Sequence, residues 1–134
     1  MTTRIHLTQR VEAAGIALFS LVAALVLYPD WWWVVLAAFL AFDLSMLGYV
    51  RSTALGATTY NAVHNYAFPA VAGVAALALD STSPSVSTAA GVLATAWAFH
   101  VGVDRALGYG LKLPDSFKHT HLGWIGGGRD RERS

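Results

Sequence analysis

Four apolar stretches of about twenty residues each, separated by short polar connections, constrain this sequence more than any other feature. They run near 10–28, 31–50, 56–79 and 85–107. A hydrocarbon core about 30 Å thick is crossed by ~20 apolar residues in a helix. Backbone amides in lipid must be satisfied internally, and no stretch shows the alternation of a barrel strand. We therefore expect an all-α integral membrane protein, a four-helix bundle running up-down-up-down, within residues 1–111.

The composition supports this class and excludes several others. Hydrophobic residues make up 55 % of the chain and charged residues 13 %, with a mean hydropathy of +0.48. The formal net charge of +1 includes no clustered excess of Lys and Arg, which excludes a nucleic-acid partner. The absence of cysteine excludes disulfides and thiolate metal sites, so only His and carboxylate side chains remain as metal ligands.

Lys and Arg residues fall on one side of the predicted bundle. They are Arg4, Arg10, Arg51, Arg105, Lys112, Lys118, Arg129, Arg131 and Arg133. The positive-inside rule then predicts that both termini are cytoplasmic, in a multi-pass protein of the inner membrane of a bacterium. Residues 112–134 are expected to form a cytoplasmic tail with a flexible, solvated end. The first stretch is predicted to be a retained helix, because LYPDWWW follows it without a small-residue cleavage site.

Four ionisable residues lie inside the apolar stretches, at similar distances from the positive side. They are Asp43, His64, His100 and Asp104. At about 1.5 Å per residue, Asp43 lies about 12 Å from Arg51, and the others fall in the same layer. Ionisable groups in a membrane helix cost a few kcal/mol each, so they normally face the interior and pair or bind a ligand. We expect these four side chains to converge on one interior cavity.

The spacing within two stretches sharpens this prediction. His100 and Asp104 are four residues apart and share a helix face, whereas Arg105 points about 140° away from His100 and can extend to the interface. Tyr60, Asn61 and His64 likewise share a face. Pro69 removes a backbone hydrogen bond one turn later, which predicts a kink there.

Two imidazoles and two carboxylates form a ligand set for zinc or a similar divalent ion. Such a site can hydrolyse an ester, because the metal activates water while a carboxylate serves as general base. We assign the metal to His64, His100, Asp104 and the tail residue His121, and the catalytic roles to Asp43 and Asp104. The predicted substrate-binding residues are Tyr60, Asn61, Arg105 and Lys112, and the cationic ones favour a phosphoester.

The expected partners are therefore membrane lipid and an amphiphilic small-molecule substrate. The many small residues of the first, third and fourth stretches permit close helix packing, which leaves a homo-oligomer open.

These motifs resemble a family of small bacterial four-helix membrane proteins described as a domain of unknown function. The resemblance rests on DLSMLGY, YNxxH, HxxxDRxLGYGLK and FKxTHLG, covers residues 11–123, and is most specific at DRALGYGLK. It implies a four-helix membrane fold and no particular activity. More loosely, HxxxD before a glycine-containing turn is similar to membrane-bound metal-dependent hydrolases, which implies metal-dependent hydrolysis for His100 and Asp104.

Other readings of the same residues stay open at this point. His64 and His100 are also a potential pair of axial ligands for a b-type haem held between facing helices. Asp43 and Asp104 alone would suit a metal-free acid and base pair acting on a lipid-like substrate. Finally, the four side chains would serve packing alone if they only form hydrogen bonds between helices. A Soret band would identify the haem, and elemental analysis separates the metal-free acid and base pair from the metal site.

Overall fold

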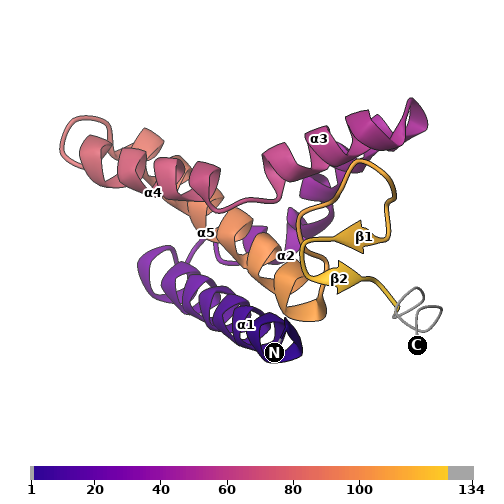
Figure 1. Ribbon diagram of the computed structural model, residues 1–134. Helices are drawn as coiled ribbons and strands as arrows, with labels where there is room; N and C mark the ends of the chain where they lie inside the picture. The colour runs from indigo at the N-terminus through magenta and orange to yellow at the C-terminus, as the bar shows by residue number, and fades with distance from the viewer. Residues whose placement is uncertain (1, 127–134) are drawn as a thin grey trace.

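The computed structural model describes residues 2–126 of the chain, and the predicted flexible end of the tail lies outside these residues. The fold is all-α, as predicted, with one small hairpin in the tail (Figure 1). The elements are α1 (Thr2–Leu27), α2 (Val34–Ala37), the 3₁₀ helix η1 (Phe39–Val50), α3 (Thr53–Val63), α4 (Ala67–Leu79), α5 (Pro84–Leu107), β1 (His119–Thr120) and β2 (Gly123–Trp124).

The distribution of side chains is that of a protein in lipid. Three helical segments are long and apolar enough to cross a membrane: Arg4–Leu27, Thr53–Leu79 and Pro84–Leu107. The buried apolar residues are mostly alanines, whereas bulky residues such as Phe19, Leu40 and Leu77 are exposed. Packing of small side chains holds helices together in lipid, where large apolar side chains face the acyl chains at no cost.

The second predicted helix departs from α geometry. Only α2 is α-helical, and the twelve residues of η1 form a 3₁₀ helix. A 3₁₀ helix rises about 2.0 Å per residue, so η1 is about 24 Å long instead of about 18 Å. The segment Val34–Val50, shorter in residues than the other three, thereby covers about 30 Å, the thickness of a hydrocarbon core.

The third predicted helix is broken rather than kinked at Pro69. The side chain of Asn65 donates to the carbonyl oxygens of Asn61 and Ala62 at the end of α3 and accepts from the backbone N–H of Ala67 at the start of α4. Pro69 lies in the first turn of α4, where a missing N–H leaves no helical hydrogen bond unmade. The break places His64 at the C-terminal cap of α3.

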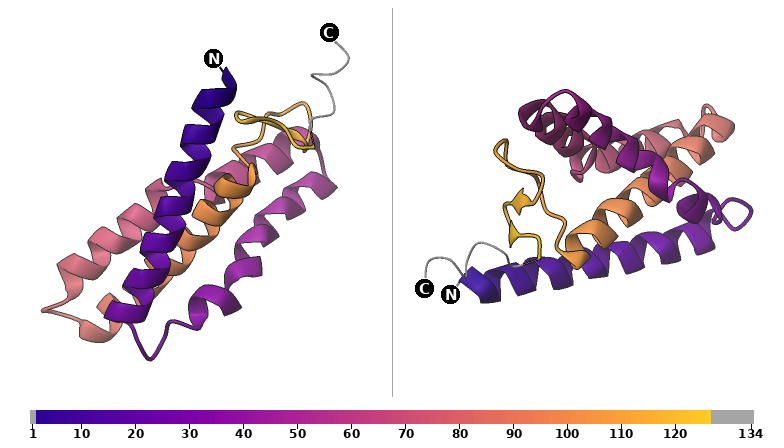
Figure 2. Two further views of the ribbon diagram at one scale, coloured as in Figure 1. Left: turned by 90° about the horizontal axis from the view of Figure 1, so that it is seen from below. Right: turned by 90° about the vertical axis from the view of Figure 1, so that its right-hand side faces the viewer.

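Helix α5 is the centre of the bundle. It packs against α1 and α4 along its length and against α2 near its start, while α3 packs on η1 (Figure 2). A Cβ at Gly102 would lie 2.9 Å from the carbonyl oxygen of Ala13, so only glycine permits the observed approach of α1 and α5. The protein core is consequently thin, and α5 contributes more buried residues to it than any other element.

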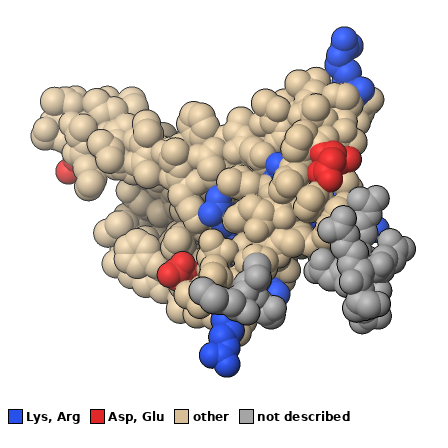
Figure 3. All heavy atoms as spheres, in the orientation of Figure 1, with Lys and Arg blue, Asp and Glu red and all other residues tan. Residues whose placement is uncertain are grey.

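The tail folds back over one end of the bundle. Gly108, with φ of +100°, ends α5, and β1 pairs antiparallel with β2. Arg10 of α1 donates to the carbonyl oxygen of Ala106 in α5, and the Tyr49 ring of η1 contacts Phe117 in the tail. In Figure 3 the surface over α4, at upper left, shows no Lys or Arg atoms.

Candidate metal centre

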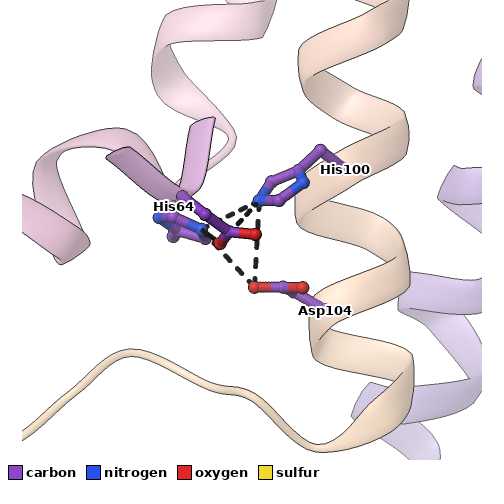
Figure 4. A group of neighbouring side chains, drawn as sticks. His64, His100 and Asp104 are labelled. Atoms are coloured by element: carbon purple, nitrogen blue, oxygen red, sulfur yellow. Dashed lines mark hydrogen bonds and ion pairs between the residues drawn. The ribbon is translucent and has the colours of Figure 1, made fainter. Parts of the chain in front are cut away.

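The structure brings together the four ionisable residues of the apolar stretches. One ligand atom from each of Asp43, His64, His100 and Asp104 lies within 4.8 Å of those of the other three. The residues come from η1, the end of α3 and two successive turns of α5. Figure 4 shows the polar ends of His64, His100 and Asp104 turned toward one another. His64 is 2 % exposed and His100 is fully buried. Among the described residues this is the one group of three or more such side chains that can hold a metal.

The distances between these atoms suit a shared ion. The Nε2 atom of His64 lies 3.4 Å from an oxygen of Asp43 and 3.4 Å from one of Asp104. The corresponding distances from Nε2 of His100 are 3.7 and 3.9 Å, and the two Nε2 atoms are 2.9 Å apart. Ligand atoms around a tetrahedral zinc are separated by about 3.3 Å, given bonds of about 2.0–2.1 Å. The four side chains therefore surround a volume of the right size for a divalent cation.

Backbone contacts orient the ring of His64. Its Nδ1 atom lies 3.0 Å from the carbonyl oxygen of Tyr60 and 3.4 Å from the hydroxyl of Ser45. Because a carbonyl can only accept, Nδ1 carries the hydrogen and Nε2 presents its lone pair to the cluster. Tyr60 also stacks on the imidazole, with ring centroids 3.6 Å apart. This arrangement is the usual one for a histidine that binds a metal through Nε2.

His100 is held by aromatic rings instead. Phe39 and Phe42 lie on the same row of η1, three residues apart, and their ring centroids are 4.6 and 5.2 Å from that of the imidazole. Nδ1 of His100 is buried without a hydrogen-bond partner in the described part of the chain. His100 therefore has its polar contacts only through Nε2, toward the cluster.

The charge of the cluster requires compensation. Two Nε2 atoms 2.9 Å apart cannot both carry hydrogen, so at most one of the two can donate to the other. Two ionised carboxylates beside two neutral imidazoles have a charge of −2, which is costly in a buried site. A divalent cation held by these four residues would neutralise this charge.

Tyr60, predicted to bind substrate, contacts the cluster directly. Its hydroxyl donates to an oxygen of Asp104 over 2.8 Å, and the side chain is 2 % exposed. The same oxygen atom of Asp104 faces His64. Tyr60 thus fixes the rotamer of a candidate ligand from α5 while it stacks on another from α3, which is a positioning role.

A small cavity borders the two carboxylates. Its volume is about 160 Å³, and it is lined by Asp43, Met46, Tyr60, Asp104, Tyr109, Lys112 and Phe117. Lys112 is only 4 % exposed, and its Nζ atom lies 4.2 Å from the centroid of the Phe117 ring and 4.9 Å from that of Tyr60. Nζ has no hydrogen-bond partner among the described residues. Burial lowers the pKa of Lys112 to about 8, although Asp104 and Asp43 act in the opposite direction.

Asn61, the second predicted substrate residue, forms two hydrogen bonds with the backbone of the tail. Its side-chain oxygen accepts from the backbone N–H of Lys112 over 2.7 Å, and its amide donates to the carbonyl oxygen of Lys112 over 2.9 Å. Asn61 therefore fastens the tail to α3 and positions Lys112 beside the cavity.

The structure places two further predicted residues away from the cluster. Nδ1 of His121 accepts from the backbone N–H of Leu111, and His121 is not part of the group of four. Arg105 is half-buried on another face of α5. Its guanidinium carbon lies 4.6 Å above the ring of Tyr66, and Nη2 contacts the carbonyl oxygen of His64 from behind. Both residues line a separate cavity.

His119 also has a local role. It stacks on Trp124 and bonds Asp115 over 2.8 Å, and this hydrogen bond holds the pKa of the Asp115 carboxyl below its usual range.

Several contacts around the cluster were absent from the sequence-based prediction. Ser45 reaches His64, and Tyr109 and Phe117 flank Lys112. The aromatic residues on both sides of Lys112 in GYGLKLPDSF are a signal for such an enclosure, because Lys ammonium groups pack over ring faces. Ser45 follows Asp43 by two residues, a spacing that shares no face of a helix, so the sequence gives no signal for its contact with His64.

Comparison with known proteins gives a family and no activity. No curated protein and no solved structure matches the chain. A family match covers residues 6–125, which include all four residues of the cluster, Tyr60, and the tail through β2. The chain therefore belongs to the family described as Domain of unknown function (DUF4260).

Proposed function

We propose that this protein is a membrane-embedded, metal-dependent hydrolase acting on a membrane-partitioned ester or phosphoester. The observation that carries the proposal is the buried group of two imidazoles and two carboxylates within 4.8 Å of one another. Zinc fits the ligand types and their spacing.

Three of the four residues are suited to hold the ion and one to act on water. His64, His100 and Asp104 are the more buried members, and each is held by neighbouring groups. Asp43 is the most exposed of the four, at 26 %, and it borders the 160 Å³ cavity. The bound metal would lower the pKa of a water ligand, and Asp43 would accept its proton as general base.

The substrate class follows from the cavity wall opposite the carboxylates. Lys112 presents an unpartnered ammonium group, enclosed by rings, to the same cavity. A cation at this position favours a substrate with an anionic group, such as a phosphoester. The location at the polar end of an apolar bundle favours a substrate that partitions into the membrane.

The orientation in the membrane is part of the proposal. All nine Lys and Arg residues belong to the termini, to the connection between η1 and α3, or to the end of α5 and the tail. We place this end in the cytoplasm, with the protein in the inner membrane of a bacterium. Cysteines introduced at Ser81 and Lys118 test the orientation with a membrane-impermeant maleimide added to intact cells. Labelling at Ser81 alone is expected, and labelling at Lys118 alone would reverse the assignment.

A haem fits the geometry less well. Axial imidazoles on opposite faces of a haem iron have nitrogens about 4 Å apart, at about 2 Å per metal–nitrogen bond. The Nε2 atoms here are 2.9 Å apart, and carboxylate oxygens lie beside them where the flat macrocycle would pass. Because the site contains two carboxylates, a metal-free acid and base pair is the second candidate function.

Metal content of the purified protein tests the proposal. We expect one zinc, or another divalent ion, per chain in the wild type, and loss of it in His64→Ala and in His100→Ala. His119→Ala is the matched control, because it removes an imidazole that lies outside the cluster. A stoichiometric metal that survives the double substitution of His64 and His100 would refute the site.

Activity is measured separately, in mixed micelles, with a fluorogenic phosphodiester that carries one acyl chain. Hydrolysis should need the metal, and Asp43→Asn should remove activity while the metal stays bound. A metal-free wild-type protein that hydrolyses the same compound, and loses activity in Asp43→Asn, would favour the acid and base pair of Asp43 and Asp104.

A further inference from the structure

A second polar cavity lies on the other side of the segment that carries His64. Its volume is about 130 Å³, and it is lined by Gln9, Glu12, Ala13, Ile16, Tyr66, Arg105, His121 and Leu122. None of these residues lines the cavity beside the metal-binding cluster. The backbone of His64 separates the two regions, because its side chain enters the cluster while its carbonyl oxygen accepts from Arg105 over 3.4 Å.

The donors in this second cavity are not satisfied by the protein. Nε of Arg105 and the hydroxyl of Tyr66 are both buried without a hydrogen-bond partner in the described part of the chain. The guanidinium lies 4.6 Å above the ring of Tyr66, so the cation and the phenol are held as one unit. Leaving buried donors unpaired costs about 1–3 kcal/mol each, more for a charged group, which an acceptor in the cavity would relieve.

An apolar groove continues from this cavity along the bundle. It has a volume of about 390 Å³ and runs between α1 and α4 over α5. Ile16 and Tyr66 line both the groove and the polar cavity, so the two are contiguous. The other lining residues are Phe19, Ser20, Ala23, Pro69, Ala70, Ala94, Thr95 and Ala98. In Figure 3 the surface is hollowed between the arm formed by α4 and the lower part of the molecule.

We propose that this combined site holds one phospholipid with a primary-amine headgroup, its phosphate against Arg105 and Tyr66 and one acyl chain in the groove. The polar cavity provides a fixed cation and a hydroxyl donor for the phosphate. Glu12, an exposed carboxylate on the same cavity wall, is placed to receive the ammonium of the headgroup. One cation and one carboxylate in a single pocket match a zwitterionic headgroup better than an anionic one.

This site is independent of the proposed hydrolysis. Arg105 contacts the ring of Tyr66 and the backbone carbonyl of His64, and the groove opens toward lipid on the faces of α1 and α4. The lipid is thus a resident ligand that fills the seam between α1 and α4, and metal binding does not depend on it.

Native mass spectrometry of the protein, purified in mild detergent and exchanged with defined lipids, tests the proposal. We expect one phosphatidylethanolamine per chain, retained over phosphatidylglycerol of the same acyl chains by about tenfold. Arg105→Gln should lower retention at least tenfold and Tyr66→Phe several-fold. Lys118→Gln, which removes an exposed cation at the same end of the bundle, is the matched control and should retain lipid as the wild type does.

Two further variants keep the test decisive if Arg105→Gln folds poorly. Ala70→Trp fills the groove without changing a charge and should expel the lipid. Glu12→Gln should remove the preference for phosphatidylethanolamine while phosphate-dependent binding remains. Metal content should be unchanged in each case.

Three results would overturn the assignment. The first is equal lipid retention in wild type, Arg105→Gln and Ala70→Trp. The second is displacement of the lipid by soluble phosphoethanolamine at equal concentration, which would make the site one for a free phosphate ester. The third is that the added mass seen in the wild type and lost in Ala70→Trp is that of a second copy of the chain and not that of a lipid.

Discussion

The last two turns of α5 separate two polar regions. One contains carboxylates and imidazoles, and the other contains hydrogen-bond donors without an acceptor among the described residues. On one face, His100 and Asp104 meet Asp43 and His64, and one nitrogen or oxygen atom of each lies within 4.8 Å of those of the others. On the other face, Arg105 and Tyr66 present donors that have no acceptor among the described residues. A rotation of about 100° from Asp104 to Arg105 is enough to separate them. One helix thus serves a region that attracts a cation and a region that attracts an anion.

The two regions differ equally in their access to the surroundings. The imidazoles of the cluster are almost fully buried, and only a small cavity reaches the carboxylates. The polar cavity at Arg105 opens into a long groove facing lipid. Gln9 and Glu12, which line this polar cavity, are exposed. We infer that an ion in the cluster exchanges slowly, whereas a lipid in the groove exchanges with the bilayer.

Acid should remove the metal from one region and leave the lipid in the other, and this is the largest effect that we expect. Imidazole must be neutral to bind a metal, and its usual pKa is about 6.5, so dialysis at about pH 4 should remove the ion. Arg105 stays charged throughout this range, so a lipid on the other face should remain bound. Elemental analysis and native mass spectrometry on the same dialysed sample measure both. Full metal retention at that pH would contradict the assignment of the imidazoles as ligands.

Two tyrosines whose hydroxyl groups differ in their partners sharpen the comparison. Tyr60→Phe removes the hydroxyl that bonds Asp104, and loss of such a supporting contact weakens metal affinity by about 10- to 100-fold. Tyr66→Phe removes the other phenol and should leave metal affinity unchanged while lipid retention falls. Competition with a fluorescent zinc chelator gives the affinities. Equal metal affinities in the two variants would mean that Asp104 is not oriented by Tyr60.

The smallest expected effect concerns Lys112, the cation beside the cluster. Its pKa of about 8 lies below the ordinary value, so its charge is present below pH 8 and is lost as the pH rises further. The rate ratio for an anionic ester over its neutral analogue should therefore fall through pH 8. Lys112→Met should lower this ratio roughly tenfold at pH 7, as expected for one charged hydrogen bond. Lys118→Met is the control, and a pH-independent ratio in the wild type would exclude Lys112 from substrate binding.

Helical spacing and the cost of charge in lipid were sufficient to predict the cluster. Asp43, His64, His100 and Asp104 each lie inside an apolar stretch, and no satisfactory position for them exists except facing one another. The pair at i and i+4 on α5 fixed one wall of the site from sequence alone. The apolar stretches likewise predicted the all-α fold, because a membrane span has few alternatives to a helix.

The remaining features depend on contacts between distant residues. The bonds between Asn61 and the backbone of Lys112 join α3 to the tail, and nothing in either segment alone indicates them. The guanidinium of Arg105 lies over the ring of Tyr66, a contact that depends on the break after α3 and that neither segment alone indicates. The 3₁₀ geometry of η1 differs from expectation. At about 2.0 Å per residue, Asp43 lies about 16 Å from Arg51 instead of about 12 Å.

The central position of α5 has a consequence for how the protein is made. Translation delivers α1, η1, α3 and α4 before the helix on which α1 and α4 pack. Asp43 and His64 therefore enter the membrane before His100 and Asp104 exist, at a cost of up to about 2.5–3.5 kcal/mol for a charged residue at the bilayer centre. Until α5 is made, Asp43 and His64 lack their partners. Synthesis of α5 then completes both the bundle and the site.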